Sequence, residues 1–187
     1  MTERFEIIRT AIEGLQVVQR QPLWDTRGYF ERFYCAERLK TLGFATGIAQ
    51  INHSLTNKRG TVRGMHFQYP PHAEKKYVSC VRGAVFDVAV DLRRGSPSFL
   101  KWHGEILSED NHRTLVVPEG FAHGFQTLTG NSELVYLVSV PYEASAEGGI
   151  NARDPRVGIR WPQPTTELSP RDAAHPEIGA DFPGIDI

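Results

Sequence analysis

The chain has 187 residues, and its 21 Lys and Arg residues against 22 Asp and Glu residues leave a formal net charge of −1 at pH 7. A chain of this length buries about 70% of its unfolded surface, so its core needs neither disulfides nor a metal ion for support. The balanced charge excludes the basic footprint of a nucleic-acid-binding protein and an acidic disordered tail. We expect one domain over residues 1–187.

The N-terminus and the cysteines indicate the compartment. Charged residues recur within residues 1–9, and no apolar signal-peptide core follows them. No run approaches the roughly 18 consecutive apolar residues that a membrane helix needs. Cys35 and Cys80 are too few for a disulfide framework and do not form a CxxC metal motif. These features predict a cytoplasmic protein that has no membrane partner.

Short elements follow one another along the chain, punctuated by many of its 17 glycines. In chain order, we predict strands over residues 6–12 and 15–20, a short helix over 36–42 before Gly43, and strands over 61–68, 77–82, 84–92, 100–107, 113–117 and 134–140. Five of the 12 prolines lie beyond Trp161, which predicts an ordered loop or a short helical turn over residues 162–187.

Two of these segments show which faces are buried. In residues 84–92, an apolar set that includes Phe86 and Val88 alternates with a set that includes Asp87 and Asp91, so one face is apolar and the other is partly polar. Residues 134–140 are apolar at both parities, which is typical of a strand between two layers. The pattern predicts an all-β fold, a jelly roll with short helical decorations.

Arg63 and His66 are the first candidate functional pair. A regular strand places residues three apart on opposite faces. Gly64 lies between them and allows a β-bulge, a device that re-aims a side chain beside many active sites. The spacing alone leaves a second interpretation open, in which Arg63 is exposed and His66 is a hydrogen-bonded core residue.

His123 and Lys76 are further candidates with equally open interpretations. His123 lies between Ala122 and Gly124, and such small neighbours permit the close approach of a ligand or another backbone segment. The alternative is a turn histidine without a task. Lys76 begins a predicted strand and can reach into the mouth of a barrel, but with Glu74 it also fits a solvated charge cluster.

The remaining candidates are Tyr136 and the pair Arg171 and Asp172. Tyr136 lies in the middle of an apolar strand, where a buried hydroxyl group needs a partner, and a core tyrosine is the default interpretation. Arg171 and Asp172 alone fit a surface turn or a helix N-cap. Gln68 stands two residues after His66, where a metal-binding double-stranded β-helix has a second histidine, so we expect no metal ion.

Several motifs in a characteristic order cover residues 6–176, nearly the whole chain. They are residues 25–30, 50–54, 63–68, 87–93 and 118–125, followed by Tyr136, Asp154-Pro155, 158–162 and 168–172. Together they closely resemble the dTDP-4-dehydrorhamnose 3,5-epimerase family. The resemblance implies a metal-free cupin jelly roll, or double-stranded β-helix, that forms a homodimer and acts without a cofactor on a nucleotide-linked 4-keto-6-deoxyhexose.

The resemblance also implies residue roles. His66 matches the catalytic base, Asp172 matches the carboxylate paired with it, and Tyr136 matches the proton donor on the opposite face of the sugar. Lys76 matches the lysine near the C4 oxygen of the substrate. The residues that match substrate contacts or line the site are Arg27, Glu31, Gln50, Asn52, Arg63, His123, Glu147 and Arg171.

The implied reaction inverts C3 and C5 of dTDP-4-dehydro-6-deoxy-D-glucose through an enolate and yields dTDP-4-dehydro-L-rhamnose. One departure bears on the nucleotide: Arg32 stands where the family has a Glu that helps to hold it. Two catalytic alternatives therefore stay open, inversion at one carbon only and action on the sugar of another nucleotide. A third alternative is a cupin that binds sugar without catalysis.

Overall fold

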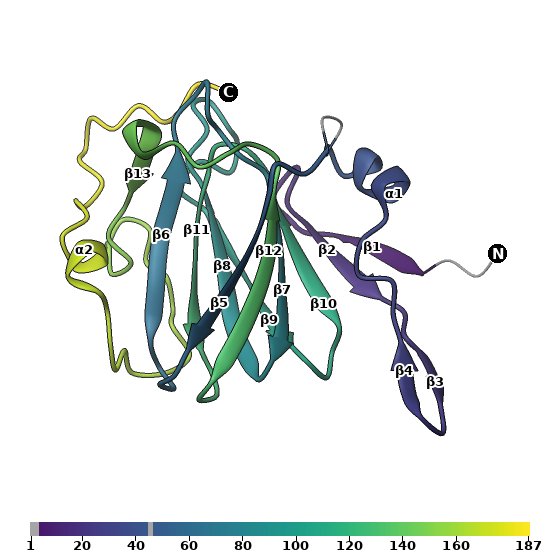
Figure 1. Ribbon diagram of the computed structural model, residues 1–187. Coiled ribbons are helices and arrows are strands. Elements are labelled where there is room, and N and C mark those ends of the chain that lie inside the picture. The colour runs from purple at the N-terminus through teal and green to yellow at the C-terminus, as the bar shows by residue number, and fades with distance from the viewer. Residues whose placement is uncertain (1–3, 45–46) are drawn as a thin grey trace.

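The computed structural model describes residues 4–44 and 47–187. Two antiparallel sheets pack face to face (Figure 1). The six-stranded sheet has the order β1 (Phe5–Arg9), β2 (Gln16–Arg20), β10 (Arg113–Val117), β7 (Lys76–Arg82), β12 (Ser132–Val138) and β5 (Gln50–Thr56). The five-stranded sheet has the order β13 (Glu147–Gly149), β6 (Val62–Gln68), β11 (Phe121–Thr127), β8 (Ala84–Asp91) and β9 (Trp102–Ser108). The predicted all-β jelly roll is confirmed.

The remaining elements are short. A hairpin of β3 (Leu23–Asp25) and β4 (Gly28–Phe30) projects away from the sandwich, as Figure 1 shows. The helices are α1 (Ala36–Thr41) and α2 (Pro170–Ala173), and a 3₁₀ turn spans Ala144–Ala146. None of the helices within the described ranges has the length and apolar character needed to cross a membrane.

Apolar side chains gather in three layers. The first fills the space between the sheets and includes Val78, Leu115 and Phe125. The second lies outside the five-stranded sheet, where the chain beyond β13 packs Ile150, Ile178 and other residues against it. The third lies outside the six-stranded sheet, where α1 and the residues around it cover the sheet. Both sheets are therefore partly covered on their outer faces, and the interior between them remains for the site.

The two strands with the clearest patterns behave as predicted. β12 sends Leu134 and Tyr136 to the inner layer and Leu137 to the outer one, so it lies between two layers. On β8, the partly polar face belongs to the interior, since Asp87 and Asp91 are both fully buried. A buried carboxylate requires hydrogen-bond partners, and Asp91 finds them in the loop that follows β8.

Five strands of the described chain were not predicted, and one of them is β13, which has three residues, two of them glycines. β5 and the hairpin strands β3 and β4 carry too many polar or exposed residues for a clear apolar pattern, and β11 contains Gly124. β5 shows the physical reason: it is an edge strand with alternating exposure, and its inner face carries Gln50 and Asn52 rather than apolar residues. The short helical turn that we expected within residues 162–187 is α2.

Candidate active site

A β-bulge on β6 brings the first two candidates together. His66 is the register partner of His123, and Arg63 is the register partner of Phe125. Arg63 and His66 are three residues apart on β6, whereas their partners on β11 are two residues apart. The extra residue in β6 turns the side chains of Arg63 and His66 to the same face of the sheet. Gly64 has φ of +124°, and a Cβ atom there would lie 2.6 Å from the Cα atom of Gly124. The predicted bulge at Gly64 is confirmed.

A cavity of about 140 Å³ lies between the two sheets at this bulge. The five-stranded sheet contributes Arg63, His66 and His123, and the six-stranded sheet contributes Lys76 and Tyr136. A second cavity of about 380 Å³ adjoins it and shares His66, Lys76 and Tyr136. The further predicted residues that line the second cavity are Gln50, Asn52, Glu147 and Arg171. The fold therefore collects these residues around one continuous space.

His66 and Asp172 form a hydrogen-bonded dyad. The Nε2 atom of His66 lies 2.8 Å from Oδ1 of Asp172, and the backbone N–H of Gly64 donates to Oδ2 at 3.1 Å. Burial acts to raise the pKa of Asp172, but the hydrogen bonds from His66 and Gly64 outweigh it and hold that pKa well below its usual range. Asp172 is thus a carboxylate that can orient and charge-balance the imidazole.

Arg171 competes for the same nitrogen of His66. Its Nη2 atom lies 3.1 Å from Nε2, although a guanidinium group can only donate. The shorter contact with the carboxylate decides the tautomer: Nε2–H donates to Asp172, and Nδ1 keeps its lone pair. Arg171 donates to Glu147 at 3.0 Å and, through Nε, to Oδ1 of Asp172 at 3.4 Å, so it places positive charge beside the dyad.

Lys76 is held inside the mouth of the site. It is the first residue of β7 and is 9% exposed, and its Nζ atom lies 3.1 Å from Oε1 of Glu74. A buried ammonium group needs such a partner. The structure therefore favours the barrel-mouth interpretation of Lys76 over a solvated cluster, and it adds Glu74 as the residue that stabilises the charge.

Tyr136 faces His66 from the other sheet. Burial raises the pKa of its hydroxyl group; the nearby charge of Arg63 lowers that pKa, and the charge of Glu74 raises it. The net direction is upward, so the phenol keeps its proton at neutral pH. A protonated phenol on one sheet and an imidazole on the other thus border the same cavity.

A second histidine–carboxylate pair lies beside the dyad. His123 Nε2 is 2.8 Å from Oδ1 of Asp87, which is fully buried on the neighbouring strand β8. Gly124 has no side chain, and a Cβ atom there would lie 2.7 Å from the carbonyl oxygen of Arg63. The close approach predicted around His123 is therefore one between the backbones of β11 and β6. His123 lies on the wall of the cavity.

The second cavity has a polar rim. Oε1 of Gln50 accepts the backbone N–H of Tyr142 at 2.7 Å, and the Tyr142 hydroxyl group donates to Glu147 at 2.9 Å. Gln68 lines this cavity and also ties loops together, because its amide nitrogen donates to the carbonyl oxygen of His72. Tyr142 has no signal in the sequence, since it stands in a loop outside every motif that was singled out.

Arg27 and Glu31 lie away from the cavities around His66 in the same chain. Arg27 is on the turn of the β3–β4 hairpin and pairs with Asp25 at 2.7 Å. The carboxylate of Glu31 is bound by Arg20 at 3.0 Å and His112 at 3.2 Å. Neither residue lines the cavities around His66.

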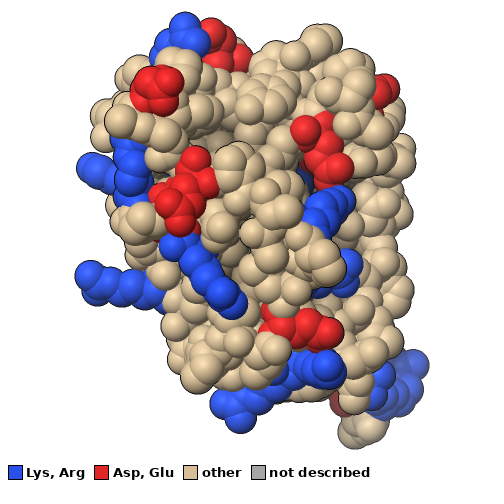
Figure 2. All heavy atoms as spheres, turned by 90° about the vertical axis from the view of Figure 1, so that its left-hand side faces the viewer, with Lys and Arg blue, Asp and Glu red and all other residues tan. Residues whose placement is uncertain are grey.

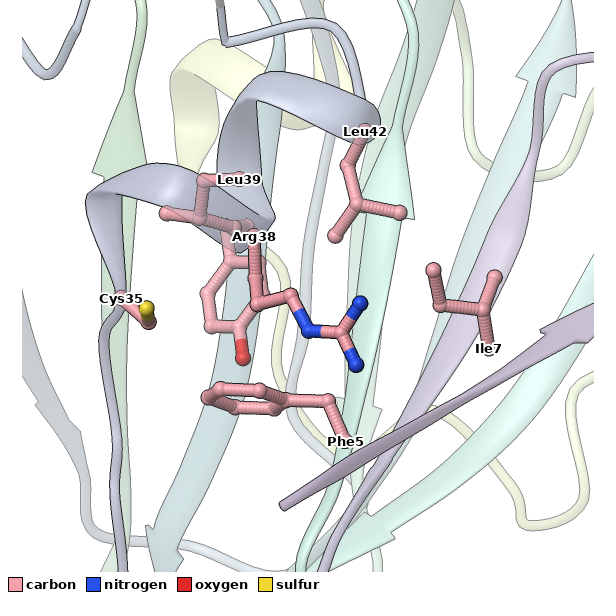
Figure 3. Close-up of a pocket in the computed structure, with 7 residues that line it drawn as sticks. Phe5, Ile7, Cys35, Arg38, Leu39 and Leu42 are labelled. Carbon is pink, nitrogen blue, oxygen red and sulfur yellow. The ribbon is translucent and has the colours of Figure 1, made fainter. Parts of the chain in front are cut away.

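One other crevice lacks this convergence. The crevice in Figure 3, about 10 Å³ in volume, lies where α1 faces β1, and its lining includes Leu39 and Leu42 on one side and Phe5 and Ile7 on the other. Its apolar lining packs a helix onto a sheet. Figure 2 shows the side of the molecule that carries α2, where acidic and basic side chains are interspersed.

The comparisons with known proteins agree with this geometry. A family model for dTDP-4-dehydrorhamnose 3,5-epimerase matches residues 9–179. A protein of that name from Sinorhizobium fredii is 42% identical over 169 residues, which cover 90% of this chain and 87% of the relative. A dTDP-4-dehydrorhamnose 3-epimerase from Streptomyces niveus is also 42% identical, over 86% of this chain and 78% of its own.

The fold has similar solved structures. One is dTDP-6-deoxy-D-glucose-3,5-epimerase from Legionella pneumophila, solved in complex with dTDP-4-keto-L-rhamnose. It superposes with a TM-score of 0.89 at 37% identity and covers 97% of this chain and 98% of its own.

Proposed function

This chain belongs to the dTDP-4-dehydrorhamnose 3,5-epimerase family, and from that premise we propose that it inverts C3 and C5 of dTDP-4-dehydro-6-deoxy-D-glucose. The product is dTDP-4-dehydro-L-rhamnose. One observation carries the proposal: a His66–Asp172 dyad on one side of the cavity faces a protonated Tyr136 on the other. Inversion needs a base and an acid on opposite faces of one carbon atom.

His66 removes the proton. The C4 ketone acidifies the C–H bonds at C3 and C5, and the pair of electrons left by either proton moves into an enolate. Nδ1 of His66 is the free nitrogen because Nε2–H is donated to Asp172. The carboxylate then stabilises the imidazolium that forms, as the aspartate of a hydrolase triad does.

Lys76 stabilises the enolate. Its ammonium group is fixed at the boundary of the two cavities by Glu74. Positive charge placed in advance where the C4 oxygen becomes negative lowers the barrier, and the effect is large in a site that excludes water. Lys76 thus stabilises the negative C4 oxygen that the C3 enolate and the C5 enolate both carry.

Tyr136 delivers the new proton to the opposite face. Its phenol gives the proton to the enolate carbon, and the proton that His66 took passes to solvent before the second carbon reacts. The phenolate recovers its proton from water, so the protein ends unchanged. Arg63 and Arg171 line the same space and offer guanidinium groups to the diphosphate.

We also infer that the active unit is a homodimer. The β3–β4 hairpin projects from the sandwich (Figure 1) and carries Trp24, Tyr29 and Phe30, which are 66%, 50% and 64% exposed. Apolar surface of this kind marks protein interfaces. A hairpin that docks on a second copy brings Arg27 to the site of that copy, which accounts for its place outside its own cavity.

Proton NMR of the purified protein with dTDP-4-dehydro-6-deoxy-D-glucose in deuterated water tests the function. We expect both the H3 and H5 signals to disappear and the L-rhamno product to accumulate. His66→Asn is expected to lower both exchange rates by at least about 10²-fold, the usual contribution of a general base. His103→Asn is the control, because His103 lies on β9 beside Glu105 and outside the cavities.

The same spectrum separates the alternatives. Exchange at C3 alone supports a 3-epimerase, the activity named for the Streptomyces niveus relative. Absence of exchange contradicts the proposed substrate and directs the next assay to the sugars of other nucleotides. Addition of a chelator is expected to leave the rates of metal-free protein unchanged.

A further inference from the structure

A second imidazole lies beside Asp172, and the proposed epimerisation does not use it. His175 follows α2 and places its Nε2 atom 3.9 Å from Oδ1 of Asp172. The rings of His175 and His66 meet edge to face with their centroids 5.6 Å apart. One potential ligand atom from each of His66, Asp172 and His175 lies within 4.8 Å of the other two. Three potential ligand atoms thus converge on one point.

The backbone around His175 holds its ring in place. Gly149 on β13 is the register partner of His66, and a Cβ atom at Gly149 would lie 2.3 Å from the His175 ring. The ring therefore rests directly on the backbone of the glycine. Asn151 anchors the following segment, since its backbone N–H donates to the carbonyl oxygen of Pro176 at 2.9 Å. The imidazole is positioned before any ligand arrives.

The polar atoms of this cluster are only partly satisfied. Nε2 of His175 is buried and has no hydrogen-bond partner within the described part of the chain, and buried polar atoms without a partner are uncommon in folded proteins. Oδ2 of Asp172 is held by the N–H of Gly64, whereas Oδ1 faces the two imidazoles and also accepts from Nε of Arg171 at 3.4 Å. Such a backbone contact is typical of the outer shell that orients a metal ligand.

We propose that His66, Asp172 and His175 bind one Zn²⁺ ion. Two imidazoles and a carboxylate are a ligand set that Zn²⁺ accepts, with a fourth position for water. Tetrahedral bonds of about 2.0–2.1 Å place ligand atoms roughly 3.3 Å apart. The separations of 2.8 Å and 3.9 Å from Oδ1 of Asp172 to the two imidazoles lie on either side of that value.

Arg171 is the group that has to move. Its guanidinium lies 3.1 Å from Nε2 of His66, but the side chain is 58% exposed and already donates to Glu147. A rotation toward Glu147 and solvent separates its charge from the ion. Ligation through Nε2 needs the other neutral tautomer of His66, so the proton leaves Nε2 and solvent returns one to Nδ1.

Zn²⁺ at this position blocks catalysis. With Nε2 bound to the ion and the proton on Nδ1, the imidazole has no free lone pair, so it can no longer act as a base. Inhibition by Zn²⁺ that a chelator reverses is the expected consequence. The inhibition rests on the proposed function, whereas the binding of the ion does not.

Titration of metal-free protein with Zn²⁺ by calorimetry, and with Co²⁺ by visible absorption, tests the site without any substrate. We expect one ion per chain, with the visible bands of four- or five-coordinate Co²⁺. His175→Ala and His175→Asn should each weaken Zn²⁺ binding at least tenfold. His53→Ala is the matched control, since His53 lies 3.0 Å from the carboxylate of Glu133 on an exposed strand face and should bind as the wild type.

Two results overturn the proposal. One is equal Zn²⁺ affinity in the wild type and both His175 variants, and the other is an equal loss in His53→Ala. The kinetic arm measures H3 and H5 exchange with increasing Zn²⁺, and His175→Ala should need at least tenfold more ion for half inhibition. If the substrate is inert even without Zn²⁺, the proposed function fails while the titration still decides the site.

Discussion

At the scale of single residues, Asp172 shows how a buried charge is maintained. It is 3% exposed, yet hydrogen bonds from His66 and from the backbone of Gly64 satisfy its two oxygens. Desolvation alone would favour the neutral acid. Because the hydrogen bonds lower the pKa of Asp172 by more than burial raises it, the carboxylate is ionised when the imidazole carries a proton.

Asp172→Asn tests this balance through pH. The native pKa of Asp172 lies below its unfolded value of about 3.9, so the carboxylate contributes stability above that pH and loses it as the pH falls through the native pKa. We expect the variant to be less stable by about 1–3 kcal/mol at pH 7. Urea unfolding at pH 7 and pH 2.5 should show that the difference shrinks in acid.

The control for Asp172→Asn is Asp25→Asn. Asp25 pairs with Arg27 on the surface of the hairpin, where solvent screens the pair. Little change is expected at either pH. A difference between wild type and Asp172→Asn that stays constant down to pH 2.5 would contradict the assigned ionisation.

Tyr136→Phe separates proton removal from proton delivery. The change removes only the hydroxyl group whose pKa burial raises, so His66 should still exchange substrate protons while inversion falls by at least about 10². Deuterium uptake with retained configuration, measured by NMR, is the expected signature. Tyr77→Phe is the control, because Tyr77 lies on the neighbouring strand and packs in the outer layer. Equal loss of exchange and inversion would contradict a dedicated donor.

At the scale of elements, the bulge on β6 decides which side chains share the cavity. A regular strand would send Arg63 and His66 to opposite faces. The extra residue in β6 opposite β11 returns both to one face, and it does so where the backbone of Gly64 and that of Gly124 nearly touch. The direction of the His66 side chain thus depends on the packing of β6 against β11, not only on the order of residues in β6.

Gly64→Ala measures the dependence of the site on this bulge. A Cβ atom at residue 64 would lie 2.6 Å from backbone, so we expect a loss of stability above about 2 kcal/mol together with a large loss of exchange activity. Gly95→Ala is the matched control, since Gly95 also has a positive φ, of +72°, but has open space around it. It should cost only the left-handed backbone penalty of about 1–2 kcal/mol. Thermal unfolding of both variants makes the comparison, and equal costs would contradict the steric argument.

At the scale of the whole molecule, the two sheets bring together residues far apart in the sequence. His66 and Tyr136 lie on different sheets, and Asp172 comes from a short helix near the C-terminus. The exposed hairpin, by contrast, carries Arg27 away from this assembly. In the homodimer that we propose, a complete site would consist of the cavity of one chain and the hairpin of its partner.

Mixing two inactive variants tests that arrangement. We expect Arg27→Ala and His66→Asn each to lose most activity as homodimers. A refolded equimolar mixture should recover about a quarter of the wild-type activity, because half of the symmetric dimers are hybrids with one intact site each. Sedimentation of each variant checks that dimers form. No recovery in dimeric mixtures would place the function of Arg27 in its own chain or outside catalysis.

Much of the fold and of the site could be predicted from the sequence, because local chemistry determined it. The period-two pattern of β8 and the apolar run of β12 depend only on the alternation of side chains along a strand, and both strands lie as expected. Gly64 was recognised as a position for a bulge because a glycine inside a strand often marks one. His66, Lys76 and Tyr136, which line both cavities, were identified through the family resemblance that the ordered motifs carry.

The tertiary structure decided what depends on contacts between distant segments. Asp87 follows an ordinary strand pattern, and only the neighbouring strand makes it the partner of His123. Glu31 stands beside Arg27 in the sequence, yet Arg20 and His112 take its carboxylate into an ion pair away from the cavities. His175 attracted no attention in the sequence, because its proximity to His66 exists only once α2 packs against β6 and β13. The chemistry of a side chain is set by its residue type, whereas its contact partners depend on how distant segments pack in the folded chain.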